Sequence, residues 1–383
     1  MRKIEWQPLV ILLLIAALVA LFYACVVLSA RVSSSDSVVS GSNLPAQGKI
    51  YHWKMATSWT KGFPGLGTAP EQFADNVRRM SNGRLIVTVY GANELVPPLG
   101  VFDAVSQGSV EMGHTSAYYW KGKMPASPFF TSVPFGMTAQ EMNGWLHYGG
   151  GMELWRELYA PFHIVPLAGC NTGVQMAGWY NREIRSIEDL RGLKMRIPGV
   201  AGEVFTRVGG TAVNIPGGDL YTSLETGVID ALEWVGPYND LAMGFHKAAK
   251  YYYYPGWHEP GPTLEIIVNQ QAYESLPEDL RAMVDVAARA ANQSMLDEYT
   301  ARNNAALQEL VEKHGVALRK LPDDVLRELR KVSEEVLREM VANDPLGQRI
   351  YHSYFSFLKN VGSYHRISER AYIEARDMTD TNR

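Results

Sequence analysis

Cysteine is scarce in this sequence, with 2 residues among 383. Cys25 lies inside an apolar N-terminal run and Cys170 lies near the middle of the chain, which excludes a disulfide framework in the folded body. No histidine stands near Cys170 in the sequence, and free cysteine is among the most buried residue types. We therefore expect Cys170 to be a small buried core residue and not a reactive nucleophile.

An excess of basic residues is also absent. The chain has 36 lysines and arginines against 40 aspartates and glutamates, a formal charge of -4 and a pI near 6.2. The two signs are interspersed, which leaves no basic stripe for the phosphate backbone of DNA or RNA. The composition therefore argues against a nucleic-acid partner.

Motifs typical of hydrolases and nucleotide-binding enzymes are missing as well. There is no Gly-x-Ser-x-Gly elbow, and the run 149–151 of three glycines follows no predicted strand and lacks the phosphate-loop lysine. His258-Glu259 has no second histidine at the spacing of a zinc-binding helix. Catalysis therefore has no visible machinery in the sequence. The classes considered are a binding protein, as its alternative an exported enzyme acting on small carboxylates, and third a structural protein.

The N-terminus carries the features of an export sequence. Two basic residues near the start precede a nearly continuous apolar run over residues 9–30. At about 1.5 Å per residue this run could span a bilayer core of about 30 Å, so residues 1–30 are a signal peptide or a membrane anchor. Lipid attachment at Cys25 is a third option. Residues 31–48 have the Ser/Gly/Pro character of a flexible tether, and the body is expected in the periplasm.

From residue 51 onward the sequence alternates predicted strands and helices. The first elements are a strand over 51–56, a helix from Pro70 to the stop at Asn82-Gly83, a strand over 85–90, a helix around 99–106 and a strand over 110–116. This β-α-β-α-β order predicts a parallel sheet, whose ligands lie beyond the carboxyl ends of the strands. Residues 57–59 and 116–119 stand at those ends.

A second alternating unit follows, and it predicts two lobes. Its elements are a strand near 164–168, a helix opened by a capping box at Ser186 and Asp189, a strand over 194–197, a helix over 200–208, a strand over 211–215 and a helix over 220–226. An apolar strand over 264–268 is expected to return to the first sheet. Two crossings between the lobes would form a hinge.

The length of 383 residues also favours two lobes over one core. We assign residues 49–168 to lobe 1, with a returning segment at about 264–320, and residues 169–263 to lobe 2. Residues 321–383 are expected to form C-terminal helices. The helix after Pro345 has more apolar surface than a lone terminal helix should expose, so it is expected to pack on a lobe or on another subunit.

Three polar side chains stand at the ends of short apolar or β-prone runs. Gln175, Arg196 and Glu233 each lie near a Gly or Pro that ends the run, where a strand delivers a functional group to a cleft. Taken singly, each could form a surface ion pair or a strand-end hydrogen bond. In combination, the arginine offers paired donors to a carboxylate, the amide adds a donor and an acceptor, and the glutamate offers oxygens to a hard cation.

Four motifs in this region carry a family resemblance. They are Gly173-Val174-Gln175-Met176, Met195-Arg196-Ile197-Pro198-Gly199, Gly227-Val228-Ile229-Asp230-Ala231 and Glu233-Trp234-Val235-Gly236-Pro237. Together they resemble the extracytoplasmic solute receptors of TRAP (tripartite ATP-independent periplasmic) transporters, of the DctP type. The run 251–259 is similar to the branch that binds 2-oxo acids and lactate. The likeness covers about residues 50–376 and implies an α/β, two-lobe periplasmic-binding-protein fold with hinge strands and long C-terminal helices.

The resemblance also implies roles for individual residues. Arg196 would bind the carboxylate of a small monocarboxylate, and Gln175 would touch both this substrate and a metal cation, sodium or calcium. Glu233, the backbone carbonyl of Trp234 and the side chain of Glu259 would complete the shell of the cation. Trp234 is also a candidate for substrate contact. An oxygen-only set suits sodium or calcium, and a glutamate at position 259 favours a divalent ion.

The tail of the substrate is left to aromatic side chains. The candidates are Trp53, Tyr118, Tyr119, Trp179 and Trp257, and Tyr118 and Asn171 join the predicted substrate-binding residues. If the aromatic residues close the cleft tightly, 2-oxo acids of three to five carbons such as pyruvate should bind best. If they recede, longer 2-oxo acids, lactate or sugar-derived acids would fit. The resemblance further implies a TRAP membrane permease as partner, a homodimer through the C-terminal helix, and no enzymatic activity.

Overall fold

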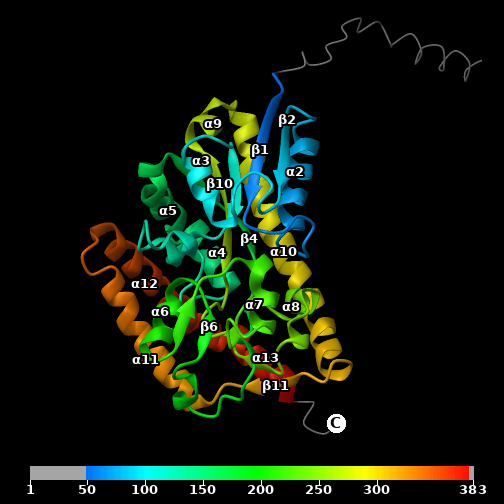
Figure 1. Cartoon of the computed structure of the whole chain (residues 1–383). Helices are drawn as coiled ribbons and strands as arrows, with labels where there is room; N and C mark the ends of the chain where they lie inside the picture. Colours follow the sequence, from blue (N-terminus) through cyan, green and yellow to red (C-terminus); the bar gives the residue numbers. More distant parts are fainter. Residues whose placement is uncertain (1–48, 379–383) are drawn as a thin grey trace, which may run out of the picture. The chain divides into compact units, whose positions relative to one another are not determined.

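Two β-sheets form the centres of two α/β lobes (Figure 1). The computed structural model describes residues 49–378, and from residue 50 onward they belong to the compact unit Ile50–Arg383. The predicted signal peptide or anchor over 1–30 and the tether over 31–48 lie outside the described residues. Within the described part of the chain, no helix has the length and apolar character needed to cross a membrane.

The first sheet is mixed, although the sequence pattern predicted a parallel one. Its strands are β1 (Tyr51–Thr57), β2 (Leu85–Tyr90), β3 (Met112–Thr115), β4 (Ile164–Asn171) and β10 (Thr263–Asn269). The order is β2-β1-β3-β10-β4, and β1 is parallel to β2 and β3 as predicted. β10 is antiparallel to both β3 and β4, because the chain enters this sheet from the second lobe. The predicted return of residues 264–268 to the first sheet is confirmed.

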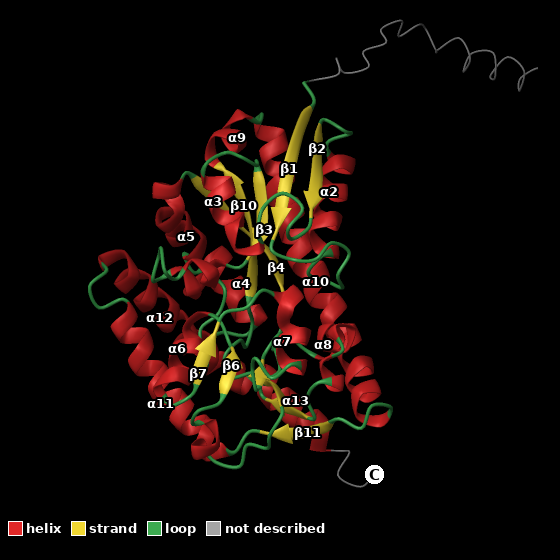
Figure 2. Cartoon of the chain, in the orientation of Figure 1, coloured by secondary structure: helices red, strands yellow, loops and turns green. Residues whose placement is uncertain are grey.

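The helices of the first lobe cover both faces of this sheet (Figure 2). They are α2 (Thr68–Met80), α3 (Val101–Ser106), α4 (Ala139–Tyr148), α5 (Gly151–Tyr159) and α9 (Gln270–Ser275). In α2, Phe73 and Val77 are four residues apart and fully buried, so one face of the helix packs on the core. Helix α4 begins with a capping box formed by Thr138 and Glu141.

The second sheet has six short strands. They are β5 (Gly178–Tyr180), β6 (Lys194–Arg196), β7 (Thr211–Val213), β8 (Ala231–Leu232), β9 (Tyr251–Tyr254) and β11 (Ala317–Lys320), in the order β11-β9-β5-β8-β6-β7. Its helices are α6 (Gly199–Arg207), α7 (Leu220–Glu225) and α8 (Pro237–Met243). The predicted capping box at Ser186 and Asp189 is present and opens a single 3₁₀ turn, Ile187–Leu190.

Four helices complete the chain. They are α10 (Glu278–Glu312), α11 (Asp323–Met340), α12 (Pro345–Ile367) and α13 (Glu369–Asp377). α10 is 35 residues long and contacts α2 and β4 of the first lobe as well as α8 of the second (Figure 1). The first half of α12 packs on the first lobe, where the Tyr354 hydroxyl accepts a hydrogen bond from Met137 N at 2.8 Å. α13 has no buried residue.

The sheets place the limits of the lobes differently from the sequence-based assignment. β4 stays in the first sheet up to Asn171, three residues beyond the assigned boundary at 168. β11 pairs with β9 in the second sheet, although residues 264–320 were assigned to lobe 1. Hydrophobic periodicity identifies a strand but contains no information on which sheet the strand joins, and this explains the difference.

Candidate functional site

Arg196 and Glu233 meet at the ends of two neighbouring strands of the second sheet. β6 and β8 are parallel, and Arg196 is in register with Leu232, the residue before Glu233. The two side chains therefore leave the sheet at the same edge and form an ion pair in which each side chain is 1% exposed. The carboxyl ends of parallel strands are where α/β sheets bind ligands.

The guanidinium of Arg196 is held in place by several groups. Its Nη1 donates to the carboxylate and to the backbone oxygen of Glu233, the latter at 2.9 Å, and its Nε donates to the backbone oxygen of Ile215 at 3.3 Å. The guanidinium carbon lies 5.2 Å from the centre of the Trp234 ring, a cation–π distance. Nη2 has no hydrogen-bond partner among residues 49–378, so this nitrogen is available to a ligand carboxylate.

Gln175 lies in the loop between β4 and β5, which is tied by its backbone to the rest of the site. Gln175 N donates to the backbone oxygen of Glu259 at 3.1 Å, and Met176 N donates to Val235 O at 3.0 Å. The backbones of Gly256 and Gln175 approach each other so closely that a Cβ on Gly256 would lie 2.1 Å from the Gln175 carbonyl oxygen. Glycine at position 256 therefore allows the two loops to pack against each other.

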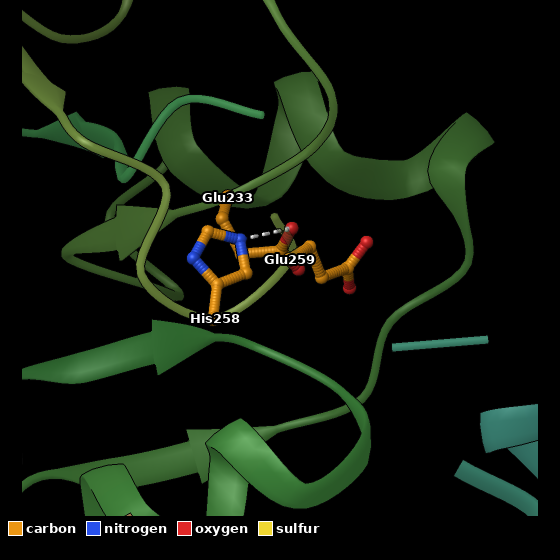
Figure 3. Close-up of side chains that lie close together, drawn as sticks. All are labelled: Glu233, His258 and Glu259. Atoms are coloured by element: carbon orange, nitrogen blue, oxygen red, sulfur yellow. Dashed lines mark hydrogen bonds and ion pairs between the residues drawn. The ribbon is translucent and has the colours of Figure 1, made fainter. Parts of the chain in front are cut away.

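Glu233, His258 and Glu259 form a compact cluster of possible metal ligands (Figure 3). One ligand atom from each lies within 4.8 Å of the other two, and all three residues are buried. His258 Nε2 is 3.2 Å from Glu233 Oε2, and the close-up shows the imidazole directed toward that carboxylate. His258 therefore helps to orient Glu233. The sequence-based prediction did not include His258 in the site, although its position next to Glu259 was a usable signal.

Several buried polar atoms of the site lack a protein partner. They are Gln175 Oε1, Arg196 Nη2, Trp234 Nε1 and His258 Nδ1, none of which has a hydrogen-bond partner within the described part of the chain. Buried polar atoms are nearly always satisfied in folded proteins, because leaving one unpaired costs roughly 1–3 kcal/mol. A polar ligand that supplies these missing bonds would explain the cluster.

The electrostatics of the site favour a cation. Burial and the neighbouring charge of Glu233 raise the pKa of the Glu259 carboxyl well above its ordinary value, while Arg196 and hydrogen bonds from Gln175 and Tyr118 act in the opposite direction. Burial is the largest single effect on the Arg196 guanidinium and lowers its pKa, but Glu233 and the other neighbouring acidic groups together outweigh burial and raise the pKa. Arg196 therefore stays charged and pairs with Glu233, while Glu259 has no ion pair among residues 49–378.

The residues present fit sodium or calcium. The carboxylates of Glu233 and Glu259 and the unpaired Oε1 of Gln175 together offer oxygen ligands, which these hard cations prefer. An imidazole nitrogen would suit zinc or another transition metal. In this structure, however, His258 Nε2 is engaged with Glu233. The candidate donors are therefore mainly oxygen atoms, with His258 Nδ1 as an unpaired nitrogen beside them.

The first lobe contributes aromatic side chains that follow β1 and β3. Tyr118 and Tyr119 lie in the 3₁₀ turn Ala117–Trp120, directly after β3, and their rings form a T-shaped pair with centroids 4.8 Å apart. Burial and the charge of Glu259 raise the pKa of Tyr118, so its hydroxyl remains a donor. Trp59 follows β1 and lies edge to face with Trp234 of the second lobe, with ring centroids 6.3 Å apart.

A cavity of about 580 Å³ lies between the two lobes beside Trp234. Trp59, Phe63 and Pro98 line it from the first lobe, and Pro216, Trp234 and Met243 line it from the second. Its size falls within the range of about 300–1,000 Å³ that is usual for small-molecule sites. The lining is mostly apolar, which suits the tail of an organic acid better than its charged head.

Several predicted site residues have other contacts. The Asn171 amide donates to Gly261 O at 3.2 Å and to Thr263 Oγ1 at 3.3 Å, and its oxygen accepts from Gly173 N at 2.8 Å. Asn171 therefore braces the chain at the start of β10, and its predicted contact with substrate stays a prediction. Trp53 belongs to the hydrophobic core, and Trp257 packs against Phe135.

The buried carboxyl of Asp240 holds the segment that follows Trp234 through hydrogen bonds. Asp240 accepts hydrogen bonds from Tyr252 Oη at 2.7 Å, from Trp179 Nε1 at 3.0 Å and from Val235 N at 3.3 Å. Mainly because of burial, the pKa of Asp240 is raised to about 7. Val235 follows Trp234 directly, so this network fixes the segment that carries the site. The indole N–H of Trp179, a predicted contact for the substrate tail, belongs to this hydrogen-bond network.

Cys170 is fully buried, as predicted. Its sulfur lies 3.3 Å from His114 Nε2, a neighbour that the sequence could not show because 56 residues separate the two. Burial raises the pKa of the Cys170 thiol above its ordinary value, and burial lowers the pKa of His114 to about 3. His114 Nδ1 accepts a hydrogen bond from Trp59 Nε1 at 2.7 Å, which orients the indole that lines the cavity.

Two α/β lobes that meet around a buried arginine and a cluster of oxygen ligands define a two-lobe solute-binding protein. The DctP family, described as bacterial extracellular solute-binding protein, family 7, matches residues 55–344. The chain therefore belongs to the DctP family of solute-binding proteins. The family and the two-lobe fold that the sequence motifs predicted are confirmed.

Characterised relatives are similar over most of the chain. A monocarboxylate 2-oxoacid-binding periplasmic protein of Nostoc sp. is 49% identical over 249 residues, 65% of this chain and 68% of that protein. The crystal structure of a TRAP periplasmic solute-binding protein from Pseudoalteromonas atlantica, with bound sodium and pyruvate, is 46% identical with a TM-score of 0.83. A second, from Colwellia psychrerythraea with bound calcium and pyruvate, has the same identity and TM-score. Each structural match covers 85% of this chain and at least 99% of the other.

Proposed function

We propose that this protein is the receptor of a TRAP transporter that captures a small monocarboxylate together with a metal cation and delivers it to a membrane permease. The substrate is a 2-oxo acid such as pyruvate, or lactate, and the cation is sodium or calcium. The observation that carries the proposal is the buried Arg196, whose free Nη2 lies in the same site as two buried carboxylates. Both relatives with pyruvate also hold one of these cations.

Each residue of the site has a role in this proposal. Arg196 donates from Nη2 to the substrate carboxylate, and Gln175 Oε1 binds the cation beside it. The carboxylates of Glu233 and Glu259 and the carbonyl of Trp234 complete the cation shell, and the cation also binds the carboxylate and the 2-oxo oxygen of the substrate. Four of these groups are the unpaired or clustered atoms described above.

The tail of the acid would extend toward the cavity beside Trp234. The cavity volume of about 580 Å³ and its apolar lining leave room for acids longer than pyruvate. Tyr118 closes the site from the first lobe, because a Cβ on Gly199 of the second lobe would lie 3.4 Å from Tyr118 Cβ. Capture is therefore coupled to the approach of the lobes, and no catalytic step is proposed.

The protein would work in the periplasm, as a member of an extracellular solute-binding family whose relatives are periplasmic. A homodimer through the C-terminal helices is also part of the proposal. It is supported by large apolar side chains that the chain leaves exposed at this end: Tyr364 (65%), Ile367 (78%) and Tyr372 (67%). Exposed apolar clusters of this kind mark association surfaces.

Isothermal titration with pyruvate tests the function. The protein is first freed of cations and then titrated in calcium, in sodium, and in a chelating buffer without sodium. Binding with a cation and its loss without one would support the receptor, while binding of dicarboxylates alone would contradict the monocarboxylate assignment. Binding of neutral sugars alone would contradict the role of Arg196.

A further inference from the structure

The formal charges buried in the site do not balance. Arg196, Glu233 and Glu259 are 1%, 0% and 5% exposed. In the ionised form that binds a cation, they carry one positive and two negative charges. The charged groups that act most strongly on Glu259 are Glu233 and Arg196. A bound monocarboxylate adds a third negative charge, which brings the site to a formal excess of two negative charges.

Glu233 and Glu259 differ in how their charges are matched. Glu233 pairs with Arg196 through one oxygen, and its other oxygen lies 3.2 Å from His258 Nε2. Among residues 49–378 no ion pair involves Glu259, whose hydrogen bonds come from the neutral side chains of Gln175 and Tyr118. Figure 3 marks an interaction between His258 and Glu233 and none to Glu259, so Glu259 supplies the charge that the described residues leave uncompensated.

A buried excess of charge is unfavourable, because removing an ion from water costs several kcal/mol even after relaxation. One divalent cation offsets an excess of two negative charges, while one monovalent cation leaves one charge uncompensated. The oxygen count points the same way. Two carboxylates, the Gln175 oxygen, the Trp234 carbonyl and two oxygens of the acid supply roughly six to eight ligands, the number that calcium takes.

We propose that Glu259 makes the site selective for a divalent cation such as calcium over sodium. The inference rests on the proposed function, since it assumes that the captured acid brings one negative charge to the same cation. Glutamine at position 259 keeps an oxygen ligand of similar reach but removes one negative charge. With the acid bound, the site of Glu259→Gln then has an excess of one negative charge, which one sodium ion balances. Aspartate at this position keeps the charge on a shorter side chain.

Cation titration of the protein without any acid is the first test. The native protein, Glu259→Gln and Glu259→Asp are freed of cations and titrated with calcium chloride and with sodium chloride, by calorimetry and thermal shift. Glu259→Gln is expected to weaken calcium binding by about tenfold or more and sodium binding by a smaller factor, because the lost carboxylate charge attracts a divalent ion more strongly, whereas Glu259→Asp retains the preference for calcium. Equal calcium affinity in the native protein and Glu259→Gln would overturn the inference.

Pyruvate titration in the two cations is the second test. In the native protein calcium is expected to support pyruvate binding at concentrations about 100-fold below those of sodium, and Glu259→Gln is expected to reduce this ratio by at least about tenfold. Equal pyruvate binding in both cations would overturn the selectivity and leave the receptor function intact. Selective calcium binding with no pyruvate heat in any buffer would instead contradict the proposed function and keep the cation assignment.

Discussion

Arg196 and Glu233 form an ion pair in which both side chains are 1% exposed, and they do so because Arg196 is in register with the residue before Glu233 on the adjacent parallel strand. The ion pair leaves part of the Arg196 guanidinium free to bind a ligand. Glu233 contacts one terminal nitrogen of the guanidinium, and the other terminal nitrogen has no partner in the described chain. The arginine is thus fixed by the protein through Nη1 and Nε and offers Nη2 to a ligand.

The variant Arg196→Lys tests this geometry. Lysine keeps the charge but loses the fork that spans Glu233, Ile215 and the ligand, so affinity for pyruvate is expected to fall by roughly 1–3 kcal/mol, about ten- to a hundredfold. Calorimetric titration measures the change. Arg78→Lys is a matched control, because the Arg78 side chain is 56% exposed on α2. Unchanged affinity in Arg196→Lys would remove Arg196 as the carboxylate anchor.

The variant Gly256→Ala tests the packing between the two site loops. The added Cβ would lie 2.1 Å from the Gln175 carbonyl oxygen, so either the loop of Gln175 moves or stability falls by about 1–3 kcal/mol. Both outcomes are expected to weaken pyruvate binding. Gly122→Ala is the control, because a Cβ there meets no atom within 4 Å. Thermal unfolding and titration of the two variants side by side make the comparison, and equal behaviour would contradict the close approach.

Closure of the lobes is expected on binding. The site takes Arg196 and Glu233 from the second lobe and Tyr118 from the first, so its contacts are completed only when the lobes meet. Small-angle X-ray scattering of the cation-loaded protein should give a smaller radius of gyration with pyruvate than without it. Superimposable profiles would indicate a binder that does not close.

Glu265 gives the protein a pH-dependent stability. It accepts hydrogen bonds from Trp120 Nε1 at 2.7 Å and Tyr159 Oη at 2.8 Å, and mainly burial raises its pKa from 4.5 to about 7. Between these two values the folded state holds a proton that the unfolded state has released. The free energy of unfolding therefore falls as the pH rises through this range, by up to about 1.4 kcal/mol per pH unit.

The variant Glu265→Gln removes this titration and keeps an oxygen acceptor. Its stability is expected to depend less steeply on pH than that of the native protein, with the relative gain developing between about pH 4.5 and 7 and complete above pH 7. Urea unfolding at pH 5, 6, 7 and 8 measures the slope. Glu274→Gln on α9 is the control, because the side chain of Glu274 is exposed. A native profile that is flat over this range would contradict the argument.

The C-terminal truncation that tests the dimer must spare the first half of α12. Ile350 and Tyr354 are fully buried, so removing the chain after Pro345 would open the core of the first lobe. Ending the chain after Ile367 removes α13, which has no buried residue. Light scattering is expected to show a dimer for the full body and a shift toward monomer for this truncation. An unchanged mass would exclude α13 from the interface.

Much of the fold was accessible from the sequence because the relevant signals are local. The alternation over 85–90, the helix stop at Asn82-Gly83 and the capping box at Ser186 were each confirmed within a few residues. The membership of strands in sheets was not accessible. β11 joins β9 across more than sixty residues of chain, and β10 enters the first sheet antiparallel, because these pairings depend on the path between the lobes.

The sequence motifs marked the polar and charged residues of the candidate site but not the residues that hold them in place. Gln175, Arg196, Glu233 and Glu259 are brought together, and each stands at the end of a strand or in a short loop that the motifs marked. Asp240 carried no such mark, because its role depends on hydrogen bonds from three residues on different elements. Likewise, the hydrogen bonds of Asn171 to two backbone groups and one hydroxyl could not be read from the sequence, and its contact with substrate stays a prediction.

The interleaving of the two sheets also sets when this chain can fold. The first sheet needs β10 between β3 and β4, and the second needs β11 at its edge, so neither sheet is complete before residues 269 and 320 have been synthesised. Strand pairings of such long sequence separation form slowly, because the chain loses loop-closure entropy before the stabilising contacts between the strands form. A nascent chain of this topology cannot complete either sheet until most of it has been synthesised. An exported polypeptide that must thread through a narrow translocation channel before folding is served by that delay.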